Sequence, residues 1–226
     1  MLNVDFRKLD IYSQKFKEQG YVLIENLLDA SLVQKWHQAL QNKPDHHWNQ
    51  IIKNSNIEKD FQVVEEQEQI FLNHNQALKD YSKGLFCFSF KRINKPIEKD
   101  DIVEEIIVCL SSISFRNALS KIVQREVKQV SVFYINRFDK GDFLTTHNDG
   151  GSSIGIVINL TKNWNPNFGG ITFMIDQESG NIRDAIVPKL GRVLVFDIQK
   201  NNQPHFVSMV TSDSSIKRLA IVVRYG

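Results

Sequence analysis

The feature of this sequence that most constrains its fold is a change of texture at Val127. From there on, short runs rich in β-branched and aromatic residues are separated by clusters of Gly, Asn, Pro and Asp. Such runs are typical of strands and such clusters of turns, and no helical periodicity lies between them. At least six strands joined by turns predict a β-sandwich or barrel. The expected strands are KQVSVFYINRF, SIGIVINL, GITFMI, RVLVFDI, HFVSMV and RLAIVVRY.

Residues 1–126 have a different pattern, in which predicted helices alternate with two predicted strands. Gly20 is expected to end the first helix, because glycine tolerates the left-handed conformation that follows many helices. Asp29 is expected to cap the next helix by accepting hydrogen bonds from free backbone N–H groups. Helices are predicted over 9–19, after Asp29, over 65–81 and over 98–123, and strands over 21–28 and 85–92.

The length of 226 residues fits one domain with a full core. We therefore predict a single α+β domain over residues 1–226. Residues 127–226 are expected to form a double-stranded β-helix core of the jelly-roll or cupin-like kind. If the protein is an enzyme, this core is expected to carry its catalytic residues. Residues 1–126 are expected to form a helical buttress against this core.

Composition and segment properties exclude several classes of protein. The net charge of +2 argues neither for nor against binding to nucleic acid. Because the sequence has no stripe of basic residues interleaved with aromatic ones, no nucleic-acid partner is expected. Apolar runs fall far short of the roughly 18 residues of a membrane span, and MLNVDFRKLD lacks a signal-peptide core. Cys87 and Cys109 lie in apolar runs typical of buried thiols. We therefore expect a cytoplasmic protein without a membrane partner. The sequence does not determine its oligomeric state.

His147 and Asp149 lie two residues apart in the stretch FLTTHNDGG. Such a pair is weak alone, because a chain of this composition holds about 0.7 His-x-acid pairs by chance. His205 begins a later predicted strand and adds a third candidate ligand, while Arg218 opens the last strand. Alternation along a strand puts residues i and i+2 on one side, so His147 and Asp149 could reach one metal ion.

The residue types at these positions suit one kind of chemistry. Two imidazoles and a carboxylate on one face of iron(II) leave three positions open for a chelating co-substrate and oxygen. An arginine on a neighbouring strand can bind a distal carboxylate through two parallel hydrogen bonds. A zinc hydrolase using the same three ligands is an alternative, but it does not explain Arg218.

Four segments of the second half occur in a distinctive order: RFDKGDFLTTHND, INLTKNWNPNFGG, PKLGRVLVFD and PHFVSMVTSDSSIKRLAIVVRYG. In that order they resemble the successive motifs of iron(II)- and 2-oxoglutarate-dependent dioxygenases, and the prolyl-hydroxylase-like branch is the nearest. The resemblance runs from Val127 to Tyr225, and GYVLIENLLD resembles the N-terminal strand common in these enzymes.

The resemblance implies roles for individual residues. His147, Asp149 and His205 would be the iron ligands, and Arg218 would bind the far carboxylate of 2-oxoglutarate. Asp149 also indicates hydroxylation, because related halogenases carry a small residue there to leave room for chloride. The implied cofactors are Fe(II), 2-oxoglutarate as co-substrate and O2, with ascorbate as a further candidate.

Two positions depart from the prolyl-hydroxylase pattern. Asn159 stands where some of these enzymes have a tyrosine that helps hold the 2-oxoglutarate carboxylate, and it is a candidate contact. Phe138 stands where a tyrosine often lines the pocket. Both changes leave the metal chemistry intact and weaken the case for a prolyl substrate.

Other residues allow only general interpretations. Arg224 should share a strand face with Arg218 and is a candidate for substrate binding, as are Arg92 and Arg137. The polar stretch 41–62 is expected to be a loop or mobile lid, and the acids at 98–101 a solvated helix start. Phe86, Phe88, Phe90 and Trp164 are expected to pack in the interior, and His37, His46, His47 and His74 to be surface or packing residues.

These observations lead to one function and two alternatives. The preferred function is hydroxylation of an unactivated C–H bond on a protein or peptide side chain, prolyl first, coupled to conversion of 2-oxoglutarate to succinate. The same chemistry on a free amino acid or small metabolite is the first alternative. A non-catalytic β-barrel binding protein is the second.

Overall fold

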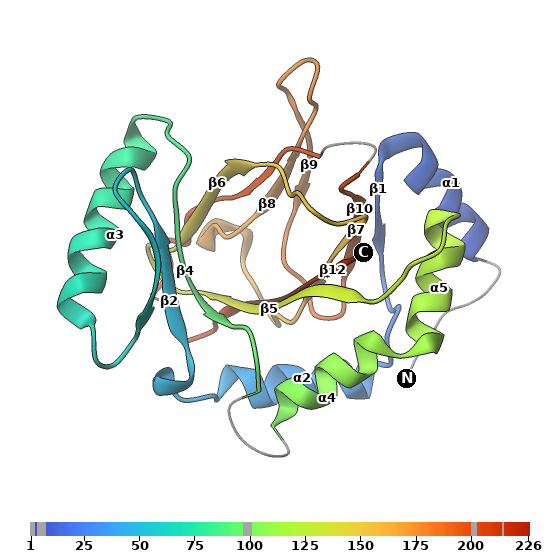
Figure 1. The fold of residues 1–226 in the computed structure, drawn as a ribbon, viewed down its shortest axis with the longest axis horizontal. Coiled ribbons are helices and arrows are strands. Elements are labelled where there is room, and N and C mark those ends of the chain that lie inside the picture. Colours follow the sequence, from blue (N-terminus) through green and yellow to red (C-terminus); the bar gives the residue numbers. More distant parts are fainter. Residues whose placement is uncertain (1–2, 4–7, 97–100, 200–202, 214) are drawn as a thin grey trace.

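The computed structural model describes residues 3, 8–96, 101–199, 203–213 and 215–226. Figure 1 shows a curled antiparallel sheet with helices packed against its outer side. The helices are α1 (Leu9–Gln19), α2 (Ala30–Gln41), α3 (Gln67–Ser82), α4 (Ile102–Ser111) and α5 (Ile113–Val123), with short 3-10 turns η2 (Asp45–His47) and η3 (Pro166–Phe168). The strands of the first half are β1 (Tyr21–Ile24), β2 (Asn49–Lys53), β3 (Glu58–Gln62) and β4 (Phe88–Ile93). Those of the second half are β5 (Val130–Phe138), β6 (Phe143–His147), β7 (Ile154–Asn159), β8 (Thr172–Ile175), β9 (Ile182–Ile186), β10 (Val193–Asp197), β11 (His205–Val207) and β12 (Arg218–Tyr225).

The strands form one sheet with the hydrogen-bonded order β1-β10-β7-β12-β5-β4-β6-β11-β8-β9. β4 pairs with β5 near its end and with β6 near its start, so the sheet turns over at this strand. One wall runs from β1 to β5 in that order, and the facing wall consists of β6, β11, β8 and β9. This topology confirms the predicted α+β fold with a double-stranded β-helix core.

All six strands predicted in the second half are present, and β6 and β9 are additional. The first half contributes four strands, so the prediction of two was wrong. β1 pairs with β10, where Tyr21 lies opposite Phe196, and β4 lies between β5 and β6. Strands from both halves therefore share one sheet, and residues 1–126 are more than a helical buttress.

The stretch 41–62 is not an irregular lid. β2 and β3 form a hairpin, and β2 also pairs with β4, which extends the main sheet. Trp48 and Ile52 are fully buried, and Phe61 is 2% exposed. The stretch is polar overall, so its sequence does not indicate strands. Its few apolar side chains are nevertheless enough to attach the hairpin to the core. The predicted irregular loop is therefore wrong, and the hairpin is part of the sheet.

The predicted helix over 98–123 is two helices broken at Ser112. The backbone of Ser112 is extended (φ −62°, ψ 146°), and its Oγ accepts a hydrogen bond from the Phe115 N–H at 3.3 Å. Serine favours such capping positions over helix interiors, which explains the break. Asp101 is also not solvated, because it is 8% exposed, caps α4 and accepts from Lys43 Nζ at 2.9 Å. Residues 98–100 lie outside the described residues.

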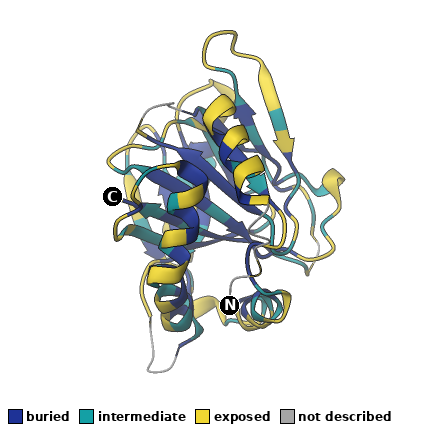
Figure 2. Cartoon of the chain, turned by 90° about the vertical axis from the view of Figure 1, so that its right-hand side faces the viewer, coloured by how far each residue is buried: buried dark blue, intermediate teal, exposed yellow. Residues whose placement is uncertain are grey.

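The predicted helix ends at Gly20 and Asp29 are confirmed. Gly20 has φ 77° and its N–H donates to Phe16 O at 2.8 Å. Asp29 Oδ1 accepts from the Ser31 N–H at 2.9 Å. Figure 2 shows buried residues on the helix faces that meet the sheet and exposed residues on the outer faces. Among the described residues, no single helix is long and apolar enough to cross a membrane; α4 and α5 reach that length only together, across a 52° bend.

A buried carboxyl group stabilises the turn that leads into β6. Asp142 is 3% exposed, its Oδ2 accepts from the Asp139 N–H at 2.9 Å, and its Oδ1 accepts from Gln50 Nε2 at 3.0 Å. Burial raises the pKa of Asp142 from its ordinary 3.8 to about 7, because the interior disfavours the charged form.

Asp142→Asn should therefore change how stability depends on pH. The folded pKa lies above the unfolded value, so the stabilisation from protonated Asp142 is complete below pH 3.8 and is lost as the pH rises through about 7. Asparagine does not titrate, so the stability of the variant relative to that of the native protein should rise between pH 5 and pH 8, as measured by urea unfolding. A stability difference that stays constant across this range would contradict the prediction.

Candidate active site

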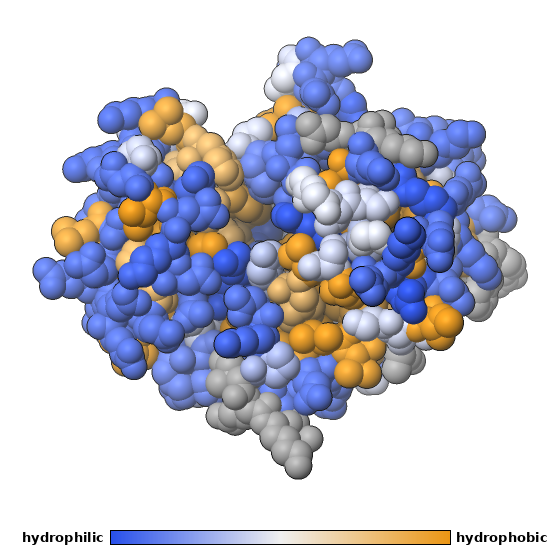
Figure 3. All heavy atoms as spheres, viewed as in Figure 1, coloured by the Kyte–Doolittle hydropathy of each residue, from blue (hydrophilic) through white to orange (hydrophobic). Residues whose placement is uncertain are grey.

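A cavity of 330 Å³ lies between the two walls of the curled sheet. Its lining comes from β5, β7, β10 and β12 on one wall and from β6, β8 and β11 on the other, with β4 and the β2–β3 hairpin at the fold of the sheet. In Figure 3 the molecular surface is hollowed between the α3 side of the molecule and the β8–β9 hairpin, and hydrophobic residues gather along the α3 side of this hollow. The cavity contains every predicted metal ligand.

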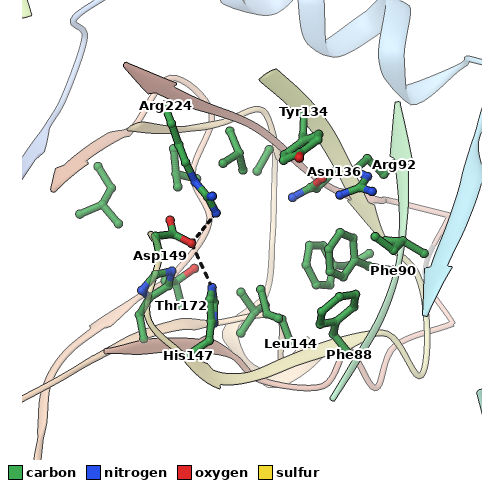
Figure 4. A pocket seen from close by; sticks show the side chains of 18 of the residues that line it. Phe88, Phe90, Arg92, Tyr134, Asn136, Leu144, His147, Asp149, Thr172 and Arg224 are labelled. Atoms are coloured by element: carbon green, nitrogen blue, oxygen red, sulfur yellow. Dashed lines mark hydrogen bonds and ion pairs between the residues drawn. The ribbon is translucent and has the colours of Figure 1, made fainter. Parts of the chain in front are cut away.

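His147, Asp149 and His205 meet at one side of the cavity (Figure 4 labels the first two). His147 ends β6 and lies directly opposite His205, the first residue of β11. Asp149 follows in the loop after β6, so strand alternation alone does not place it beside His147. The distance from His147 Nε2 to Asp149 Oδ1 is 3.5 Å, and one ligand atom from each of the three residues lies within 4.8 Å of the others.

Backbone carbonyls orient both histidines. The Nδ1 atom of His147 contacts Thr145 O at 3.1 Å, and that of His205 contacts Gln203 O at 2.8 Å. Because a carbonyl can only accept, each Nδ1 is assigned the proton, and each Nε2 keeps a lone pair for a metal. Burial, together with the neighbouring His147, lowers the pKa of His205 to about 4, so its ring is neutral at physiological pH.

Arg224 supports the carboxylate of this group. Its Nη2 donates to Asp149 Oδ1 at 2.5 Å, as Figure 4 shows. Burial opposes ionisation of Asp149, but the neighbouring His147 ring and the Arg224 cation lower its pKa overall. Two imidazoles and one carboxylate thus face one point, which is the donor set that iron(II) accepts in a facial triad.

Arg218 lies in the same cavity, with only 2% of its surface exposed. Its Nε donates to Gly170 O at 2.6 Å and its Nη2 to Thr172 Oγ1 at 3.0 Å, and its guanidinium lies 4.5 Å from the Phe138 ring centre. Burial lowers the pKa of Arg218 to about 10, so it stays a cation. Among the described residues, no carboxylate lies within 4.0 Å of it, and a buried cation without a counter-charge favours an anionic ligand.

Gly170 is required for this arrangement. Its φ is +63°, and a Cβ built there would lie 2.8 Å from Arg218 Cδ. A larger residue would therefore be strained and would displace the arginine.

Aromatic residues form another part of the wall. Phe86, Phe88 and Phe90 all line the cavity, and Phe86 is 46% exposed. The expected interior packing is confirmed for Phe88 and Phe90, which are buried against Phe138, and was wrong for Phe86. Trp164 packs as expected, since its Nε1 donates to Gly169 O at 2.9 Å.

Other predicted site residues lie elsewhere or have partners. Asn159 is not among the residues that line the cavity, and its amide donates to Arg192 O at 3.4 Å. Arg137 is buried outside the cavity and pairs with Asp139. Arg92 does line it. The predicted role of Asn159 stays a prediction.

Sequence reasoning missed Asn136 and Tyr134, which also line the cavity. A signal for them was present, because Tyr134, Asn136 and Phe138 alternate along β5 and must share one face. The register places Phe138 opposite Arg218 and Asn136 opposite Ala220. Only knowledge of this pairing identifies that face as the one toward the metal ligands.

A family model described as "Oxoglutarate and iron-dependent oxygenase degradation C-term" matches residues 6–225. The chain belongs to this family. Oxoglutarate- and iron-dependent oxygenases use iron and 2-oxoglutarate, and the group of His147, Asp149 and His205 could hold the iron. A non-catalytic barrel and a zinc hydrolase are therefore not supported.

Solved structures share the fold of this oxygenase. A prolyl-4-hydroxylase from Pseudomonas putida has a TM-score of 0.64 at 14% identity, covering 96% of this chain and 98% of that one. A 2OG-Fe(II) oxygenase family oxidoreductase from Burkholderia pseudomallei has a TM-score of 0.64 at 16% identity, covering 96% and 90%. A prolyl hydroxylase from Trichoplax adhaerens, in complex with a hypoxia inducible factor oxygen degradation domain peptide fragment, has a TM-score of 0.59 at 16% identity, covering 97% and 89%. A comparison with curated proteins found no match.

Proposed function

We propose that this oxygenase hydroxylates an unactivated C–H bond on a peptide or protein side chain, with proline as the first candidate. In the overall reaction, 2-oxoglutarate loses CO2 and becomes succinate. One oxygen atom of O2 enters succinate and the other enters the substrate as a hydroxyl group. Bound iron would supply the oxygen activation that no side chain can perform.

The observation that carries this proposal is the pairing of two features in one cavity. His147, Asp149 and His205 present three donor atoms within 4.8 Å, and Arg218 lies buried without a carboxylate partner among the described residues. A dicarboxylate that chelates the metal with one end can meet Arg218 with the other. A hydrolytic metal site would not require the cation of Arg218 beside the metal ion.

The residues of the cavity divide the remaining work. Thr172 and the Gly170 carbonyl hold the Arg218 guanidinium in position, while Arg224 holds Asp149. The wall of Phe86, Phe88 and Phe90 offers apolar surface that would exclude water around the reacting C–H bond.

The prolyl assignment draws on solved structures that share the fold. Two of them are prolyl hydroxylases, and the Trichoplax adhaerens enzyme is in complex with a peptide fragment. The volume of 330 Å³ is small for a cavity that must also hold 2-oxoglutarate, which favours the alternative of a free amino acid or small metabolite. A side chain inserted from a peptide would need no more space than such a molecule.

Succinate release and product mass test the proposal together. The purified protein, supplied with Fe(II), 2-oxoglutarate, O2 and ascorbate, is incubated with proline-containing peptides and with free amino acids. The expected result is substrate-stimulated succinate release matched by a gain of one oxygen atom in the substrate. Succinate release that is equal with and without iron would contradict the proposal.

A further inference from the structure

Arg92, Asn136 and Tyr134 form a polar patch on the cavity wall, here named the amide subsite. The register of β4 and β5 pairs Arg92 with Asn136, and Tyr134 lies two residues before Asn136 on the same face. Figure 4 shows these side chains across the cavity from Asp149 and His147. The patch is therefore placed to contact a substrate whose side chain points at the metal ligands.

Two polar atoms of the amide subsite have no hydrogen-bond partner. They are Arg92 Nε, a donor, and Asn136 Oδ1, an acceptor, and both are buried. Asn136 as a whole is 8% exposed. Leaving such groups unsatisfied in the interior typically costs about 1–3 kcal/mol each, so a ligand that satisfies both gains that difference.

The charge of Arg92 is already balanced. Its Nη2 contacts Asp60 Oδ1 at 3.1 Å and Oδ2 at 3.3 Å, and its guanidinium lies 4.3 Å from the Tyr134 ring centre. The free Nε thus acts as a hydrogen-bond donor beside a neutralised pair, and it is less suited to an anion than Arg218 is. A neutral group that both accepts and donates fits this subsite.

A peptide group has these properties, because its C=O can accept from Arg92 Nε and its N–H can donate to Asn136 Oδ1. The ammonium of a free amino acid only donates, so it could use Asn136 Oδ1 but not the donor Arg92 Nε. It would also need a carboxylate, but the two that line the cavity are taken, Asp149 by Arg224 and Glu58 by Lys53 at 3.1 Å. An unpaired buried ammonium is strongly disfavoured.

We propose that Arg92 and Asn136 bind a backbone amide of the substrate, so that the enzyme selects a residue within a peptide over the free amino acid. This inference depends on the proposed hydroxylase function and adds the group that is recognised. Arg218 serves the co-substrate and the amide subsite serves the substrate, so the two can be altered separately.

The first experiment compares two panels with the native enzyme, Fe(II) and 2-oxoglutarate. One panel contains blocked tripeptides of the form acetyl-Gly-Xaa-Gly-amide, with each amino acid at Xaa, and the other contains the free amino acids. Succinate release above the substrate-free rate is expected with one or more blocked peptides and with none of the free amino acids. Stimulation by free amino acids alone, or by neither panel, would overturn the inference.

The second experiment uses variants with the best peptide. Asn136→Leu removes the acceptor, and Arg92→Lys keeps a cation for Asp60 but lacks the Nε–H. Each should raise the KM for the peptide about three- to tenfold, the effect of losing one hydrogen bond, with the affinity for 2-oxoglutarate unchanged. Asn181→Leu is the matched control for Asn136→Leu, because Asn181 lies in the exposed turn between β8 and β9. It should leave the KM for the peptide unchanged.

The outcomes separate this inference from the proposed function. An unchanged peptide KM in both variants would overturn the amide subsite while leaving the hydroxylase intact. A native protein that binds no 2-oxoglutarate in the presence of iron, and releases no succinate without substrate, would overturn both.

Discussion

His147→Ala is expected to eliminate succinate formation and iron binding while leaving the protein folded. The imidazole supplies one of only three protein donor atoms at the site, and the remaining two cannot complete a facial triad. The structural loss is small, because the ring is partly exposed and makes one hydrogen bond, to Thr145 O at 3.1 Å. That bond contributes about 1 kcal/mol to the free energy of unfolding.

Iron binding by equilibrium dialysis, succinate release and thermal unfolding should be measured on the same preparation. His46→Ala is the matched control, because His46 is an exposed histidine on η2, outside the cavity. It should retain full activity. Iron-dependent succinate release by His147→Ala at more than a few per cent of the native rate would remove His147 from the metal site.

Arg218→Leu is expected to weaken 2-oxoglutarate binding about ten- to a hundredfold while iron binding survives. The basis is the loss of a charge-assisted contact in a buried site, worth about 1.5–3 kcal/mol. The variant should also unfold at the same temperature as the native protein or higher without ligand, because it removes a buried cation that has no carboxylate partner among the described residues.

Arg137→Leu is an informative control for this change, since Arg137 is buried almost as deeply but outside the cavity. Arg137 pairs with Asp139 at 2.8 Å, so its loss should lower stability by about 1–3 kcal/mol and leave 2-oxoglutarate affinity unchanged. Ligand-induced thermal stabilisation separates the two, because 2-oxoglutarate should stabilise the native protein and Arg137→Leu but not Arg218→Leu. Equal stabilisation of Arg218→Leu would contradict the assignment.

The sequence was sufficient for the features that depend on local patterns. Runs of β-branched and aromatic residues between turn clusters identified six of the second-half strands, and the conformational freedom of Gly20 and the side-chain acceptor of Asp29 marked two helix ends. The four ordered motifs led to the correct family. The residues that form each of these patterns lie close together in the sequence, so local backbone geometry is enough to relate them.

Local patterns failed where distant segments determine the environment of a residue. The stretch 41–62 reads as polar and irregular, yet β2 pairs with β4 and becomes part of the sheet. Asp101 reads as solvated, but Lys43 and the start of α4 satisfy it in a buried position. In both places a partner far along the chain compensates for burying polar groups, and sequence periodicity cannot show that partner.

The composition of the site shows the same division. His147, Asp149, His205 and Arg218 were identifiable from the sequence because their residue types and order are chemically specific. Only the tertiary structure shows that Arg224 holds Asp149, 75 residues away in the chain, and that Arg92 and Asn136 face the same cavity. Strand register decides which side chains share a face, and register is set by pairing between strands that no local pattern specifies.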